Sequence, residues 1–108
     1  MTTTETVFFN VPANLFKGIE AVGGKLKITE VELIFTPHKV NIQSAPVTIN
    51  IGEVIKVQKR NTILFVPNGM SVTVKGGKEY KFVVNKRGKL IDHLNQTIGE
   101  KRMQHLLF

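Results

Sequence analysis

The sequence contains no cysteine, which excludes disulfide bridges and thiolate metal sites and leaves side-chain packing to hold the fold together. It also lacks long hydrophobic runs: the longest, residues 63–66, falls far short of the ~20 residues that span a bilayer. The Thr-rich residues 1–6 have neither the basic start nor the apolar stretch of a secretory signal. These absences indicate a cytoplasmic protein without a transmembrane segment.

Catalytic and metal-binding motifs are missing as well. Nucleophilic catalysis needs a nucleophile, a base and an orienting group, and none of the three histidines stands in such a motif. His93 and His105 are twelve residues apart, so they do not form the i, i+4 pair with which one helix face holds a metal. The glycine pairs at residues 23–24 and 76–77 are not followed by a helical pattern, which a phosphate-binding loop requires. We therefore expect a non-catalytic protein with no metal and no cofactor.

What is present is the composition of one globular domain. The chain has 108 residues, of which 42% are hydrophobic and 21% charged, which suffices for a single core and is too little for two. We interpret residues 1–108 as one domain, with residues 1–6 as a flexible N-terminus.

The charge is positive and unevenly placed. Of the net +7, residues 1–35 carry −1 and residues 36–108 carry +8. Fixed positive potential attracts anionic partners such as a lipid surface, a nucleic acid or an acidic protein, whereas solubility alone is the other reading of such a charge. The sequence lacks the aromatic-rich strand, zinc finger and recognition helix of nucleic-acid-binding folds, so we do not expect a nucleic acid as the partner.

Apolar and polar residues alternate in several short segments separated by turn residues, the pattern of a β meander. In the first hairpin, pairing Leu26 with Phe35 and Ile28 with Leu33 places all four side chains on one face. In the last hairpin, a loop of residues 76–78 best explains the pattern. That register pairs Val74 with Tyr80, Val72 with Phe82, and Lys75 with Glu79 on the wet face.

The middle of the chain shows the same alternation. Apolar positions are expected to face the core at Val47, Ile49, Ile51, Ile55 and Val57, with a break at Gly52. Lys56, Gln58 and Arg60 should face water. A further strand over residues 62–66 and a turn over residues 67–69 complete the pattern.

Past Asn85 the apolar period becomes helical. Leu90, Ile91, Leu94 and Ile98 form one stripe, which predicts a helix over residues 85–98 that ends at Gly99. Residues 99–108 are expected to form a separate helical tail. Its apolar residues, at helical spacing or at the very end, are Met103, Leu106, Leu107 and Phe108.

Three segments together resemble a GRAM domain. They are Gly-Gly-Lys-Leu-Lys-Ile-Thr-Glu-Val-Glu-Leu-Ile-Phe-Thr-Pro-His-Lys at residues 23–39, Ile-Gly-Glu-Val-Ile-Lys-Val at 51–57, and Lys-Glu-Tyr-Lys-Phe-Val-Val at 78–84. The resemblance implies a pleckstrin-homology-like fold: a mainly β barrel of two bent antiparallel sheets, about seven strands in all, capped by a C-terminal helix. The meander followed by a helix agrees with it.

The resemblance also implies a binding function. Some members bind phosphoinositides or other anionic lipids at membranes, and others bind proteins. In the pleckstrin-like superfamily a headgroup site often uses a Lys followed by a spaced basic pair that ends in Arg, and Lys17, Lys25 and Lys27 are similar to this pattern. Lys27 stands at the Arg position, where only Arg gives bidentate phosphate contacts.

We therefore expect a module that associates peripherally with an anionic membrane surface or phosphoinositide-like headgroup through Lys17, Lys25, Lys27 and Lys39. A second basic group, Lys56, Lys59 and Arg60, adds diffuse attraction of about 1 kcal/mol per charge near the membrane. The alternative is a protein-interaction or oligomerisation module that uses a groove of the barrel or the apolar tail.

Overall fold

A computed structural model describes residues 5–40, 44–60 and 68–107 of the chain. Its elements are β1 (Val7–Lys17), β2 (Glu20–Thr29), β3 (Glu32–Pro37), β4 (Val47–Asn50), the 3-10 turn η1 (Ile51–Glu53), β5 (Val54–Arg60), β6 (Gly69–Val74), β7 (Glu79–Val84) and the helix α1 (Arg87–Leu107). The strand expected over residues 62–66 and the first residue of the turn expected over residues 67–69 lie outside the described residues.

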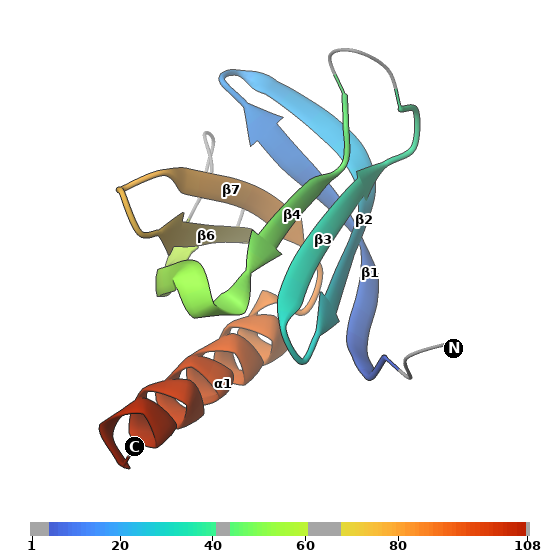
Figure 1. Ribbon diagram of the computed structural model, residues 1–108. Coiled ribbons are helices and arrows are strands. Elements are labelled where there is room, and N and C mark those ends of the chain that lie inside the picture. Colours follow the sequence, from blue (N-terminus) through green and yellow to red (C-terminus); the bar gives the residue numbers. More distant parts are fainter. Residues whose placement is uncertain (1–4, 41–43, 61–67, 108) are drawn as a thin grey trace.

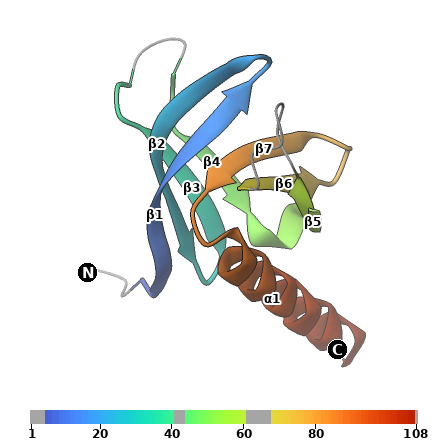
Figure 2. The ribbon, with the colours of Figure 1, turned by 180° about the vertical axis from the view of Figure 1, so that it is seen from behind.

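The seven described strands form one antiparallel sheet in the order β4-β3-β2-β1-β7-β6-β5. Strand β1 joins the two halves, since it pairs with β2 along its length and with β7 through residues 13–15. The sheet curls strongly, and α1 lies across its open lower end (Figures 1 and 2). This arrangement confirms the expected mainly β, pleckstrin-homology-like architecture with a C-terminal helix.

The core lies between the concave face of the sheet and the first half of α1. The side chains of Phe35 and Phe82 come from opposite halves of the sheet, with ring centroids 6.1 Å apart, and both are buried. Leu90 and Leu94 of α1 are fully buried in the same cluster. Burial of each such side chain stabilises the fold by roughly 1.5–3 kcal/mol.

The β2–β3 hairpin, the first one expected from the sequence, has the predicted register, with Leu26 opposite Phe35 and Ile28 opposite Leu33. Its turn is organised by Thr29, whose Oγ1 accepts hydrogen bonds from the backbone N–H groups of Val31 and Glu32 at 3.2 and 3.1 Å. Threonine commonly replaces a backbone acceptor in this way.

The predicted register of the last hairpin is wrong by two residues. Val72 lies opposite Tyr80 rather than Phe82, and the loop consists of residues 75–77. The loop is set by Gly76 and Gly77, whose φ angles of 92° and 96° are ones that other residues rarely adopt. A slip of two residues keeps every side chain on its own face, so the predicted burial survives the error.

The structure also corrects the expected burial of Ile55. A β-bulge between Val54 and Lys56 shifts the alternation of β5, so that Val54 and Val57 point inward and Ile55 is 45% exposed. Lys56 and Arg60 are exposed as predicted, and Gln58 is half-buried.

The predicted end of the helix at Gly99 is wrong, because α1 continues without a break to Leu107. Gly99 keeps a helical backbone, and the positive φ of 59° belongs to Lys86, just before the helix. Glycine in a helix costs about 1 kcal/mol, which the good helix formers of residues 100–104 offset. Residues 99–107 therefore extend the core helix rather than forming a separate tail.

Within the described residues no helix is both long and apolar enough to cross a bilayer.

Candidate functional site

Lys25 and Lys27 lie side by side on the outer face of β2. Leu26 and Ile28, which alternate with them, are fully buried, so the two lysines must point away from the core. The flanking strands place Thr36 beside Lys25 and Asn10 beside Lys27. Two cations thus share one surface with polar neighbours on both sides.

These side chains border a shallow depression of about 460 Å³ on the outer face of β1–β3, which we call the outer hollow. Its lining comprises Asn10, Lys25, Lys27, Ile34, Thr36, Pro37 and His38. His38 is held in place by its backbone N–H, which donates to the carbonyl oxygen of Gly23 at 3.0 Å. Residues that carry ammonium, imidazole, hydroxyl and amide groups therefore border the same depression.

One of the two lysines has an acidic neighbour. Lys27 Nζ lies 3.2 Å from Glu5 Oε2, and the two side chains are 33% and 45% exposed. Ion pairs this exposed contribute about 0–1 kcal/mol, so an anion entering the outer hollow competes with Glu5 at little cost.

Lys17 and Lys39 lie at one end of the molecule, beyond the outer hollow. Lys17 is at the β1–β2 turn, where Gly18 takes a φ of 62°, and Lys39 follows the end of β3. Both segments are at the top of Figure 1, opposite α1. Each of these two segments contains an exposed apolar residue: Ile19 is 95% exposed and Val40 is 61% exposed.

The second predicted basic group does not join the first. Lys56, Lys59 and Arg60 are on β5, which the strand order separates from β2 by three strands. Arg60 is already paired: its Nη2 lies 2.9 Å from Glu79 Oε2, and Ser71 Oγ donates to the same carboxylate. The hydrogen bond from Ser71, followed by that from Arg60, lowers the pKa of Glu79 below its usual 4.5.

The structure describes the side chains of only two of the four predicted partner-binding residues. Met103 and Leu106 are 60% and 82% exposed on the last turns of α1, while Phe108 and the side chain of Leu107 lie outside the described residues. Leu106 borders a second depression, between α1 and the η1–β5 segment, that the sequence did not predict.

Several site residues were missed at the sequence level. His38 and Asn10 complete the lining of the outer hollow. The β2–β3 register places the end of β3 beside Gly24, and the β1–β2 register places Asn10 beside Lys27, so these two registers could have identified both residues. Among the described residues no group of three or more histidine or acidic side chains is arranged to hold a metal ion.

A family model with the description "GRAM domain" matches residues 2–100, which is most of the chain. No curated protein matches it in sequence.

Solved structures share the fold. The C-terminal domain of an unknown protein from Leishmania infantum superposes with a TM-score of 0.75 at 18% identity, over 87% of this chain and 84% of that one. The linker-DH/PH domains of p115-RhoGEF give a TM-score of 0.72 at 11% identity, over 92% of this chain and 31% of that one. The DH/PH fragment of PDZRHOGEF, crystallised with human RhoA, gives 0.68 at 9% identity, over 89% and 29%. At such identities the likeness concerns the fold.

Proposed function

Because this chain belongs to the GRAM domain family, we propose that it is a non-catalytic module that binds phosphorylated headgroups at an anionic membrane surface. The observation that carries the proposal is the outer hollow. Lys25 and Lys27 line it together with His38, Thr36 and Asn10. None of its described lining residues is acidic, and the exposed Glu5 forms an ion pair with Lys27.

The chemistry of these side chains favours attraction over tight stereospecific recognition. Lysine presents a compact, well-hydrated charge and cannot make the bidentate phosphate contacts of arginine. Each lysine close to an anionic surface contributes about 1 kcal/mol, and salt screens that contribution. The module should therefore bind weakly at ionic strengths near the physiological value and more tightly at low salt.

Apolar residues at the end of the molecule support membrane contact. Ile19, at the β1–β2 turn between Gly18 and Glu20, is 95% exposed, and Val40, which follows Lys39 after the end of β3, is 61% exposed. An exposed isoleucine gains favourable burial only where something apolar covers it, such as the acyl boundary of a bilayer.

Vesicle sedimentation tests the proposal. Phosphatidylcholine vesicles with and without phosphatidylserine and a phosphoinositide are mixed with the full chain at low salt. We expect binding to the anionic vesicles only. The double variant Lys25→Glu/Lys27→Glu should lose about 2 kcal/mol, or roughly thirtyfold in affinity.

The matched control is Lys75→Glu/Lys101→Glu, which also lowers the net charge of +7 by four but leaves the outer hollow intact. It should retain most of the binding. Equal losses in both double variants would reduce the interaction to net charge and contradict a site at the outer hollow. Absence of binding to anionic vesicles at low salt would contradict the function itself.

A second function, protein interaction, is favoured by one observation. Met103 and Leu106 are exposed on a helix end that extends beyond the sheet (Figure 1). Size-exclusion chromatography with light scattering on the full chain and on Leu106→Ser tests self-association. A dimer that the substitution abolishes would assign the helix end to contacts between copies, and a monomer in both would leave it to a different protein.

A further inference from the structure

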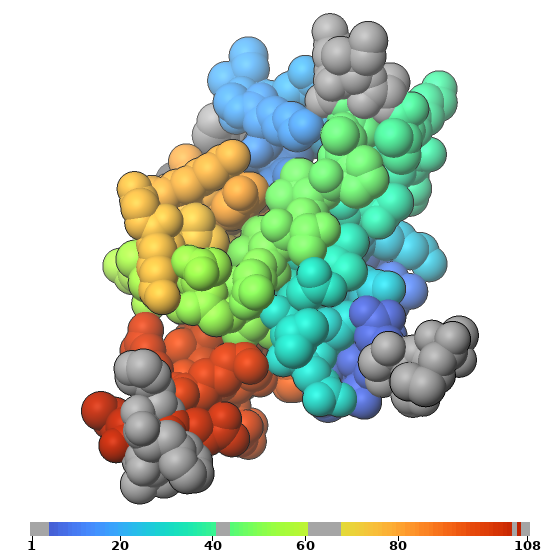
Figure 3. Space-filling view, viewed as in Figure 1, coloured from blue at the N-terminus to red at the C-terminus, as the bar shows by residue number. Residues whose placement is uncertain are grey.

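The second half of α1 and the η1–β5 segment enclose a groove of about 500 Å³. Figure 3 shows the orange-to-red surface of α1 adjoining the green surface of η1 and β5. Its lining comprises Ile51, Gly52, Val54, Ile55, Lys75, Ile98, Lys101, Arg102 and Leu106. We call it the helix groove.

The floor of the helix groove is apolar. Ile51, Val54 and Ile98 belong to the core and are at most 7% exposed. Ile55 and Leu106 stand beside them and are 45% and 82% exposed. The apolar surface of the core thus continues outward into the groove and stays accessible there.

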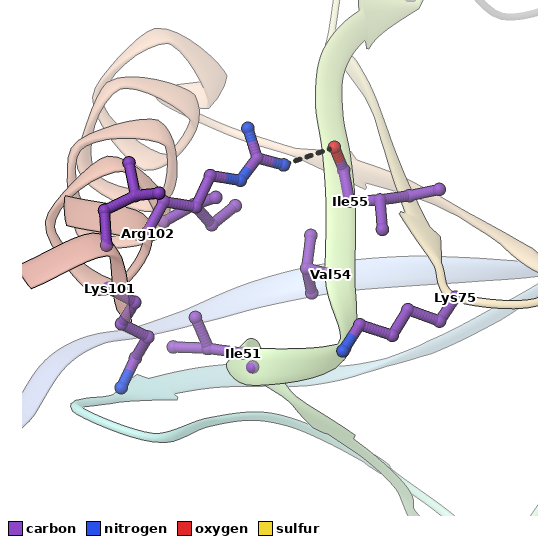
Figure 4. Close-up of a pocket in the computed structure, with 9 residues that line it drawn as sticks. Ile51, Val54, Ile55, Lys75, Lys101 and Arg102 are labelled. Atoms are coloured by element: carbon purple, nitrogen blue, oxygen red, sulfur yellow. Dashed lines mark hydrogen bonds between the residues drawn. The ribbon is translucent and has the colours of Figure 1, made fainter. Parts of the chain in front are cut away.

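The rim of the helix groove is cationic. Lys101 and Arg102 come from α1, and Lys75 reaches over the floor from the β6–β7 loop on the other side (Figure 4). None of the nine described lining residues is acidic. Three positive charges therefore surround the floor with no carboxylate in the groove to neutralise them.

Two backbone contacts hold the walls in position. The backbone N–H of Lys75 donates to the carbonyl oxygen of Glu53 at 2.8 Å, which fixes the β6–β7 loop against η1. Arg102 Nη2 donates to the carbonyl oxygen of Ile55 at 3.1 Å (Figure 4). This carbonyl lies at the bulge of β5, the last strand in the sheet order, and faces α1.

We propose that the helix groove binds an acidic segment of a partner protein in which carboxylates flank two or more large apolar side chains. Apolar side chains of the segment cover Ile55 and Leu106, and its carboxylates meet Lys75 and Lys101. Buried apolar anchors surrounded by complementary charge are the usual composition of a peptide-binding surface. The proposal deepens the second function above and is independent of lipid binding.

Shape favours a protein segment over a lipid chain as the occupant. The helix groove is partly open to solvent, whereas sites for small apolar ligands bury most of the ligand surface. One wall is an edge strand and the other a helix, an arrangement in which an extended segment can lie. The basic rim selects against basic segments by charge repulsion.

Selection from a displayed library of random twelve-residue peptides against the full chain tests the proposal. We expect enriched peptides to combine at least two Asp or Glu with two large apolar residues. Synthetic versions should bind Lys75→Glu/Lys101→Glu roughly tenfold more weakly than the unmodified chain. This variant keeps the hydrogen bond between Arg102 and Ile55. Leu106→Ser, at an exposed position, should weaken binding as well without affecting folding.

Lys25→Glu/Lys27→Glu is the matched control, because it changes the net charge equally at the outer hollow. It should bind the peptides with little change while losing anionic vesicles. No enrichment of acidic-apolar peptides, or equal weakening in both double variants, would overturn the proposal. Loss of vesicle binding in Lys75→Glu/Lys101→Glu alone would assign the helix groove to the membrane instead and overturn it as well.

Discussion

The imidazole ring of His93 in α1 lies 4.6 Å, centroid to centroid, from the ring of Phe8 in β1. Phe9 approaches the same imidazole edge-on at 5.4 Å. The start of β1 is thereby attached to the helix by three rings. His93 Nε2 is buried and has no hydrogen-bond partner among the described residues, so this attachment leaves one polar atom unsatisfied.

Replacing His93 with leucine should raise the stability of the chain. A buried polar atom without a partner costs about 1–3 kcal/mol, and leucine keeps the apolar contact with the phenyl rings. Urea unfolding should show a free energy of unfolding higher by about 1 kcal/mol. Phe8→Ala is the opposing control and should lower it by about 1 kcal/mol. A loss of stability in His93→Leu would mean that Nε2 is satisfied in solution.

Gly24→Ala should destabilise the fold by about 1–3 kcal/mol, because the site is already filled. An added Cβ would meet the Thr36 carbonyl oxygen, Phe35 Cζ at 2.8 Å and Pro37 Cα at 2.8 Å. Two of these three atoms belong to the backbone of β3 and cannot rotate away. A fall in the midpoint of thermal unfolding checks this expectation.

Gly99→Ala is the matched control for that substitution. Nothing lies within 4 Å of a Cβ at Gly99, which is helical and exposed. Alanine should therefore stabilise α1 by about 1 kcal/mol. If both glycine substitutions shifted stability in the same direction, the close approach of β2 and β3 at Gly24 would not be the cause of the first effect.

The carboxylate of Glu79 should make stability depend on pH in acid. Its pKa in the folded chain is lowered below 4.5, mainly by the hydrogen bond from Ser71 and then by Arg60. The ionised form therefore stabilises the folded state above pH 4.5, and this contribution is lost as the pH falls through the lowered pKa.

Glu79→Gln should accordingly lower stability by about 1 kcal/mol at neutral pH and by less in acid. Urea unfolding measured across the acid range checks the profile. A difference between the two proteins that stayed constant with pH would show that the charge of Glu79 does not stabilise the folded state.

The register of the β2–β3 hairpin could be predicted because one pairing gives each buried residue an apolar partner, Leu26 with Phe35 and Ile28 with Leu33, whereas a slip of two residues would place Phe35 opposite Gly24. The last hairpin could not be, since two registers that differ by two residues bury the same side chains. The deciding factor was the backbone of Gly76 and Gly77, which hydrophobic patterning does not contain.

The two depressions also differ in how far the sequence predicts them. For the outer hollow, the outward direction of Lys25 and Lys27 follows from the alternation of apolar and polar residues, whereas the position of His38 requires knowing where β3 ends. The helix groove was missed because Gly99 was interpreted as a helix end. With about 3.6 residues per turn, a continuous helix places Arg102 and Leu106 on the same face as Ile98.

The pairing of β1 with β7 has a consequence for how the chain folds. Ala13 lies opposite Val84, so the seam that joins the two halves connects segments far apart in the sequence. During synthesis β1 can pair with β2, and β2 with β3, early. The other edge of β1 must wait until β7 has left the ribosome. Long-range pairings of this kind slow folding, and an unpaired edge invites pairing with other chains. We therefore expect nascent or truncated chains that lack β7 to aggregate, even when the other six of the seven described strands are already present.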